Sequence, residues 1–226
     1  MNTNQTLKTQ VYNLILFDKS GSMDCVRHET VNGCNETLNK ILEAQKEYGN
    51  TQNQFVTMAA FCGCGLQFFY DRTPISKTAP ILQEQYEPCC MTPLLDSIGT
   101  TVFQLKNDTK DIDDATVLVT IITDGKDNLS SKWSSNSLKA LIEECKNKGW
   151  LFSLIGTNQE IVDFADSIAI PNTYLWKKTH NGTIEMFKTE NASRAFYYNK
   201  LNELNLSCND IDIRLIYRRQ YSEGYF

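Results

Sequence analysis

Three oxygen-bearing side chains stand at alternate positions directly after an apolar run. Residues 14–17 are followed by Asp18-Lys19-Ser20-Gly21-Ser22. A carboxylate and two hydroxyls can converge on one point if this loop curls, and Gly21 permits the tight backbone that this requires. An ordinary turn with a capping serine would use the same residue types. This segment alone therefore leaves both interpretations open.

A second carboxylate, Asp124, follows the β-branched and apolar run 116–123, which is predicted to be a central strand. In a doubly wound sheet, ligands bind outside the carboxyl ends of the strands. Asp18 and Asp124 would face one cleft if their strands are neighbours. Hydroxyls and carboxylates without a nearby histidine or paired cysteine suit Mg²⁺, Mn²⁺ or Ca²⁺ rather than zinc.

Short apolar runs alternate with longer helical patterns, which predicts a largely parallel sheet flanked by helices. The connection 62–65 is so short that the strands on either side should pair antiparallel, as a hairpin at the sheet's edge. The expected strands are 11–17, 55–61, 66–70, 116–123 and 150–155, and the expected helices are 30–48, 93–106, 137–148 and 159–166.

Two structures are compatible with the stretch 172–205. Asn181-Gly182 could close a hairpin between 174–178 and 183–188, or Thr179 could begin a helix that turns Ile184 and Phe187 inward. The helix is the favoured interpretation.

Three separated segments together resemble the von Willebrand factor type A (vWA) domain and its metal-ion-dependent adhesion site. They are Asp18-x-Ser20-x-Ser22, Thr92-Pro93-Leu94 and Thr123-Asp124-Gly125, in that order. The resemblance covers about residues 10–200. It implies a Rossmann-like α/β fold: a doubly wound, mostly parallel sheet with one antiparallel edge strand and helices on both faces. The predicted hairpin at 55–70 falls where that edge strand is expected.

The resemblance also implies a ligand set and a partner. Ser20, Ser22 and Thr92 would ligate Mg²⁺ (or Mn²⁺ or Ca²⁺) through their hydroxyls, and Asp18 and Asp124 would supply charge, directly or through water. In the family, the last coordination position is taken by water or by a carboxylate of a partner protein. Neutral hydroxyl ligands leave the ion electron-poor, which strengthens its attraction for an external Asp or Glu.

The sequence departs from the family pattern near Thr92. The preceding residues are often glycines in relatives, whereas here they are Cys89-Cys90-Met91. Lys19 is expected to point to solvent, and Asp24 and Asp127 are interpreted as solvated loop residues.

The segment 156–171 resembles stand-alone bacterial members of the family, which favours a cytoplasmic bacterial or phage-borne protein. The 226 residues suit a single α/β domain over 10–206, with an N-terminal tail, 1–9, and a C-terminal tail or docked segment, 207–226.

The net charge of −5 argues against a nucleic-acid partner, which requires a clustered basic surface. The basic pairs Lys177-Lys178 and Arg218-Arg219 are expected on solvated faces. The polar N-terminus and the lack of an apolar run near ~20 residues predict no membrane span and a cytoplasmic location, unless a leader has been removed.

Eight cysteines are expected to be free thiols in a reducing compartment. Cys62-Gly63-Cys64 and Cys89-Cys90 lack the CxxC spacing typical of zinc sites, so packing is favoured over a zinc or redox role. With Cys25, these four could also form a thiol-rich rim on the metal-bearing face, although chance burial is favoured.

Three hypotheses for function follow. The favoured one is a non-enzymatic adaptor module whose bound cation engages an acidic residue of a partner. The alternative is a Mg²⁺-dependent phosphohydrolase that uses Asp18 as nucleophile or ligand, with Lys126 as the best charge clamp. No phosphate-binding glycine loop supports that alternative. The third is an ion with a purely structural role.

Overall fold

A central sheet of six strands organises residues 7–226, the part of the chain that the computed structural model describes; residues 1–6 of the expected tail lie outside it. The strand order is β3-β2-β1-β4-β5-β6. Only β3 pairs antiparallel with its neighbour, which confirms the predicted edge hairpin. The strands are β1 (Thr9–Asp18), β2 (Gln52–Cys62), β3 (Gly65–Pro74), β4 (Ala115–Ile122), β5 (Leu151–Gly156) and β6 (Asn172–Leu175).

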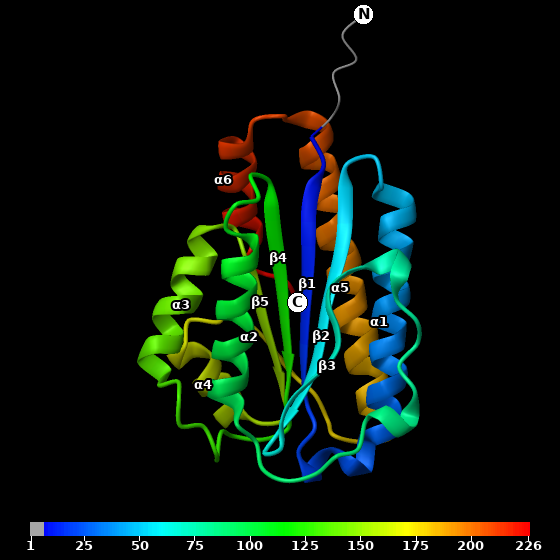
Figure 1. The fold of residues 1–226 in the computed structure, drawn as a ribbon, viewed down its shortest axis with the longest axis vertical. Helices are drawn as coiled ribbons and strands as arrows, with labels where there is room; N and C mark the ends of the chain where they lie inside the picture. Colours follow the sequence, from blue (N-terminus) through cyan, green and yellow to red (C-terminus); the bar gives the residue numbers. More distant parts are fainter. Residues whose placement is uncertain (1–6) are drawn as a thin grey trace, which may run out of the picture.

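Helices cover both faces of this sheet, as the doubly wound prediction requires. Helices α1 and α5 pack on one face, and α2, α3 and α4 pack on the other (Figure 1). The helices are α1 (Arg27–Tyr48), α2 (Leu94–Thr109), α3 (Ser135–Asn147), α4 (Gln159–Ser167), α5 (His180–Ser207) and α6 (Ile211–Tyr221). None of those in residues 7–226 combines the length and apolar character that crossing a bilayer requires.

The near-continuous apolar character of β1 follows from this two-sided cover. Val11, Ile15 and Phe17 belong to the core under α1 and α5. Leu14 and Leu16 belong to the core under α2, α3 and α4. A parallel strand that is buried on both faces has no solvated side on which to place polar residues.

The long helix α5 confirms the helical interpretation of residues after Thr179, and the alternative hairpin is wrong. Thr179 caps the helix by accepting a hydrogen bond from the Gly182 N–H at 3.1 Å. The preceding strand, β6, pairs parallel with β5 instead of closing a hairpin. Phe187 faces inward as expected, and it lies so close to α1 that a Cβ at Gly33 would be 2.0 Å from its ring.

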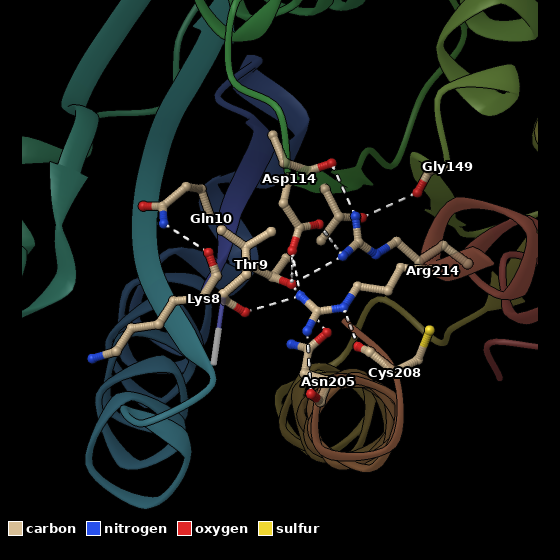
Figure 2. A network of polar contacts seen from close by, with 12 residues as sticks. Lys8, Thr9, Gln10, Asp114, Gly149, Asn205, Cys208 and Arg214 are labelled. Atoms are coloured by element: carbon tan, nitrogen blue, oxygen red, sulfur yellow. Dashed lines mark hydrogen bonds and ion pairs between the residues drawn. The ribbon is translucent and has the colours of Figure 1, made fainter. Parts of the chain in front are cut away.

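Helix α6 is attached at the amino-terminal end of β1 and β4 through a buried ion-pair network (Figure 2). Arg214 donates to Asp114 Oδ2 at 2.5 Å, and Arg218 donates to Oδ1 of the same carboxylate. The Thr9 hydroxyl also contacts Asp114, at 2.9 Å. The expected solvated face is therefore wrong for Arg218. This side chain is buried, and its charge is paired with the buried carboxylate of Asp114. Arg219 stays on the surface, where it donates to the Asn147 carbonyl at 2.8 Å.

We expect Asp114→Asn to destabilise the protein strongly, because it leaves two buried guanidinium groups without their anion. Breaking such a buried pair costs about 3–5 kcal/mol. The free energy of unfolding, measured by urea denaturation, gives the loss. Asp113→Asn is the matched control, since Asp113 is exposed. Equal stability of the two variants would contradict the role assigned to Asp114.

Candidate metal centre

Asp18 lies fully buried at the carboxyl end of β1, and both of its carboxylate oxygens accept hydrogen bonds. Oδ1 accepts from the Ser20 N–H at 2.7 Å, and Oδ2 accepts from the Thr123 hydroxyl at 2.7 Å. Burial raises the pKa of Asp18, an effect that these two hydrogen bonds partly offset. The carboxylate is thus held in one orientation at an energetic cost in desolvation.

A chain of short contacts joins Ser20, Ser22 and Asp124. The two serine Oγ atoms are 3.1 Å apart, and Ser22 Oγ donates to Asp124 Oδ1 at 2.9 Å. Adjacent oxygens around an octahedral Mg²⁺ with bonds of 2.0–2.1 Å lie about 2.9 Å apart, so these spacings suit a shared hard cation. Ser20 and the side chain of Asp124 are buried and Ser22 is exposed, so the chain of oxygens reaches the surface at its middle member.

Thr92 lies beside this chain without joining it. Its N–H donates to Asn128 Oδ1 at 2.7 Å, and the Asn128 N–H donates to the Thr92 carbonyl at 3.1 Å. These bonds attach Thr92 to the loop after β4. The Thr92 hydroxyl lies close to Gly125 in that loop, since a Cβ added to this glycine would be 3.8 Å from Thr92 Oγ1. Within residues 7–226, no hydrogen bond joins that hydroxyl to the other four candidate side chains.

Lys178 is a member of this site that the sequence reasoning missed. Its Nζ lies 2.6 Å from Asp124 Oδ2 and 3.0 Å from the Ser22 carbonyl. The side chain of Asp124 is only 1% exposed, and that of Lys178 is 29% exposed. The expected solvated face is therefore wrong for Lys178. Its position three residues after β6, at the carboxyl edge of the sheet, was the available signal.

Two further residues that were expected to face solvent have structural partners. Asp127 accepts the Leu95 N–H at 3.1 Å, so it caps the otherwise unpaired amino end of α2. Lys19 is half-buried and donates to Gln67 Oε1 on β3 at 2.8 Å. The solvated interpretation is wrong for both, whereas Asp24 is exposed as expected.

The residues proposed for hydrolytic chemistry do not meet. Lys126 extends to Glu160 at 2.7 Å in an exposed pair. Both oxygens of Asp18 are already engaged, and the residue has no exposed surface. A buried carboxylate whose two oxygens both accept hydrogen bonds is poorly placed for nucleophilic attack on an entering phosphoester.

The donor set fits a hard divalent cation. Its side chains offer carboxylate and hydroxyl oxygens, the ligands that Mg²⁺, Mn²⁺ and Ca²⁺ prefer. A nearby positive charge would also stabilise the two buried carboxylates, and Lys178 already supplies such a charge to Asp124.

The sequence matches no protein-family model and no curated protein. Solved structures with a similar fold include the SpRpn10 VWA domain, with a TM-score of 0.56 and 10% identity over 79% of this chain and 94% of that one. The pilus adhesin SpaC from Lactobacillus rhamnosus GG has a TM-score of 0.63 and 13% identity, over 86% of this chain and 31% of SpaC.

A third similar structure is proximal thread matrix protein 1 from the mussel byssus with a zinc-occupied MIDAS motif. It gives a TM-score of 0.53 and 12% identity over 83% of this chain and 46% of that one. This chain thus spans less than half of the adhesin and of the byssus protein. Together, the sheet order, the antiparallel edge strand and these similarities show that the chain has the vWA fold.

Proposed function

We propose that this protein is a metal-dependent protein-binding module. In this proposal Asp18, Ser20, Ser22, Thr92 and Asp124 hold a divalent cation, with Mg²⁺ preferred and Mn²⁺ or Ca²⁺ as alternatives. The observation that carries the proposal is the row of oxygens from Ser20 through Ser22 to Asp124, whose 3.1 and 2.9 Å spacings match a hard-ion coordination shell.

The exposure of Ser22 supports recognition of another protein over a buried structural ion. A cation at this position would supply an electron-poor centre for an Asp or Glu oxygen of the partner. Among the proteins of similar fold, one is a pilus adhesin and one carries a zinc-occupied MIDAS motif, which is consistent with this role.

The adaptor role, the bacterial cytoplasmic setting and the absence of nucleic-acid or membrane partners are parts of the same proposal. The resemblance of residues 156–171 to stand-alone bacterial relatives and the net charge of −5 support them. In this view, one vWA unit spans residues 10–206, and α6 docks on it through Arg214 and Arg218.

We expect the wild-type protein to bind Mn²⁺, and the Mn²⁺-loaded protein to bind a short peptide that carries a single Glu. The same peptide with Gln should not bind, and Asp18→Ala combined with Ser20→Ala should abolish both interactions. Calorimetric titration measures the two steps, and Asp24→Ala is the matched control because Asp24 is exposed.

Full metal affinity in the double variant would refute the proposal. Metal-dependent turnover of generic phosphoesters that is lost in Asp18→Asn would instead favour the hydrolase.

We expect Asp18→Asn to unfold at a temperature equal to or above that of the wild type when both are metal-free. Burial raises the pKa of Asp18, so the folded state favours the protonated carboxyl. Protonation of Asp18 therefore stabilises the folded protein fully below the unfolded pKa, and this stabilisation is lost as the pH rises through the folded pKa. Above the folded pKa the ionised carboxylate opposes folding, and Asn removes that charge.

The same variant should lose the increase in melting temperature that Mg²⁺ gives the wild type. Thermal unfolding with and without Mg²⁺ tests both effects, and Asp24→Asn should behave like the wild type. A lower melting temperature with an intact Mg²⁺ response would contradict this role for Asp18.

We expect Lys178→Met to tighten Mn²⁺ binding about 5- to 10-fold, because a cation at Asp124 must share that carboxylate with the ammonium group. This factor corresponds to roughly 1 kcal/mol, at the upper end for a partly exposed ion pair. Lys177→Met is the matched control, since Lys177 is exposed. Unchanged or weaker Mn²⁺ binding by Lys178→Met in the same titration would show that the ion pair does not compete with the metal.

A further inference from the structure

Four cysteines from two separate segments converge beside the candidate metal centre. Cys62 ends β2 and Cys64 lies in the two-residue turn to β3, whereas Cys89 and Cys90 precede Thr92. The sulfur atoms of Cys62, Cys64 and Cys89 all lie within 4.8 Å of one another. Cys90 adds a fourth sulfur, 3.3 Å from Cys64.

Backbone contacts hold these cysteines in place. Cys62 pairs with Gly65 across the hairpin, where Gly65 has a φ of +113° that favours glycine. On the other segment, the Cys89 N–H donates to the Lys19 carbonyl at 2.8 Å, and the Gly21 N–H donates to the Cys90 carbonyl at 3.2 Å. Both segments are therefore ordered independently of any bond between the sulfurs.

Two of the sulfur spacings are close to those of tetrahedral coordination, whereas the 3.3 Å between Cys64 and Cys90 is shorter. Zinc–thiolate bonds of about 2.3 Å place adjacent sulfurs of a tetrahedral site about 3.8 Å apart. Cys89 Sγ lies 3.6 Å from Cys62 Sγ and 3.8 Å from Cys64 Sγ. We propose that Cys62, Cys64 and Cys89 form a three-thiolate binding site for a thiophilic cation, Zn²⁺ first, with the Cys90 thiol beside it.

Hydrophobic packing does not explain this cluster. Cys34 and Cys145 are fully buried within the two cores, as packing thiols are. In contrast, the cluster is buried only on the side of Cys62: Cys64 and Cys90 are exposed and Cys89 is half-buried, so the cluster is open to an entering ion. Each thiol that ligates the cation releases its proton to solvent, and the thiolate is the ligand.

The site differs in chemistry from the proposed oxygen centre and does not depend on it. Soft thiolates select zinc-like ions, whereas hydroxyls and carboxylates select Mg²⁺ or Mn²⁺. A cation bound by both segments would fix the hairpin tip to the loop that carries Thr92.

Cobalt substitution tests the proposal, since thiolate ligation of Co²⁺ gives sulfur-to-metal charge-transfer absorption that oxygen ligation does not. We expect this absorption in the reduced wild type and its disappearance when Zn²⁺ is added. Excess Mg²⁺ should leave it unchanged. Cys64→Ser combined with Cys89→Ser should lose the band while keeping the wild-type melting temperature within a few degrees.

Two controls make the result specific. Cys208→Ser removes a thiol outside the cluster and should retain the band. Asp18→Ala combined with Ser20→Ala should also retain it, so failure of the thiol site and failure of the proposed function are distinguishable. If the double cysteine variant unfolds, Cys64→Ser alone provides the test, because that residue is exposed.

No band in the reduced wild type, or an undiminished band in the cysteine variants, would overturn the proposal. Peptide mapping supplies the remaining outcome. A Cys64–Cys90 disulfide in protein purified without reductant, together with no Zn²⁺ binding after reduction, would show that these cysteines form a redox pair and not a metal site.

Discussion

The parallel pairing of β1 with β4 is the constraint on which the candidate metal centre depends. Phe17 is in register with Ile122, so the next residues, Asp18 and Thr123, meet directly beyond the paired strands. Their side chains are joined by the 2.7 Å hydrogen bond from the Thr123 hydroxyl to Asp18 Oδ2. A shift of one residue would turn every side chain of β1 to the opposite face, which the two apolar cores oppose because each takes alternate residues of that strand. Burial of apolar surface therefore sets the register that brings the polar groups together.

Charge is the second determinant of this edge of the sheet. Asp18 and the side chain of Asp124 are both withdrawn from water, and the charge of Asp124 contributes to the raised pKa of Asp18. Backbone and hydroxyl donors satisfy Asp18, whereas Lys178 supplies a full positive charge to Asp124. The loop between β6 and α5 is thereby tied to the loop after β4. The opposite end of the sheet follows the same rule, since the buried carboxylate of Asp114 is paired there with Arg214 and Arg218.

Elements with a strong apolar pattern were predictable, and long-range ion pairs were not. The expected strand 116–123 corresponds to β4, Ala115–Ile122, and the expected helix 159–166 corresponds to α4, Gln159–Ser167. The rule that parallel strands end at one edge placed Asp18 near Asp124. Lys178 lies 54 residues from its partner Asp124, and Arg218 lies 104 residues from Asp114. A basic residue of this kind has the same local pattern as a surface residue, so only the packed structure reveals its partner.

The loop before Thr92 lies between two sets of side chains proposed here as ligands, oxygens on one side and sulfurs on the other. On one side it contacts the loop that carries Ser20 and Ser22, through the hydrogen bond from the Gly21 N–H to the Cys90 carbonyl. On the other side its cysteines contact the sulfurs of Cys62 and Cys64. Under the two proposals above, affinity order alone cannot keep zinc out of the oxygen centre, because nitrogen, oxygen and sulfur sites all bind Zn²⁺ more tightly than Mn²⁺. A thiolate site close by changes the competition, since sulfur ligands retain zinc where hydroxyls do not. When there is less zinc than protein, the cysteines would bind the zinc, and the hydroxyls and carboxylates would remain free to bind a harder cation. In that case Cys62, Cys64 and Cys89 would help to determine which metal the neighbouring oxygen centre binds.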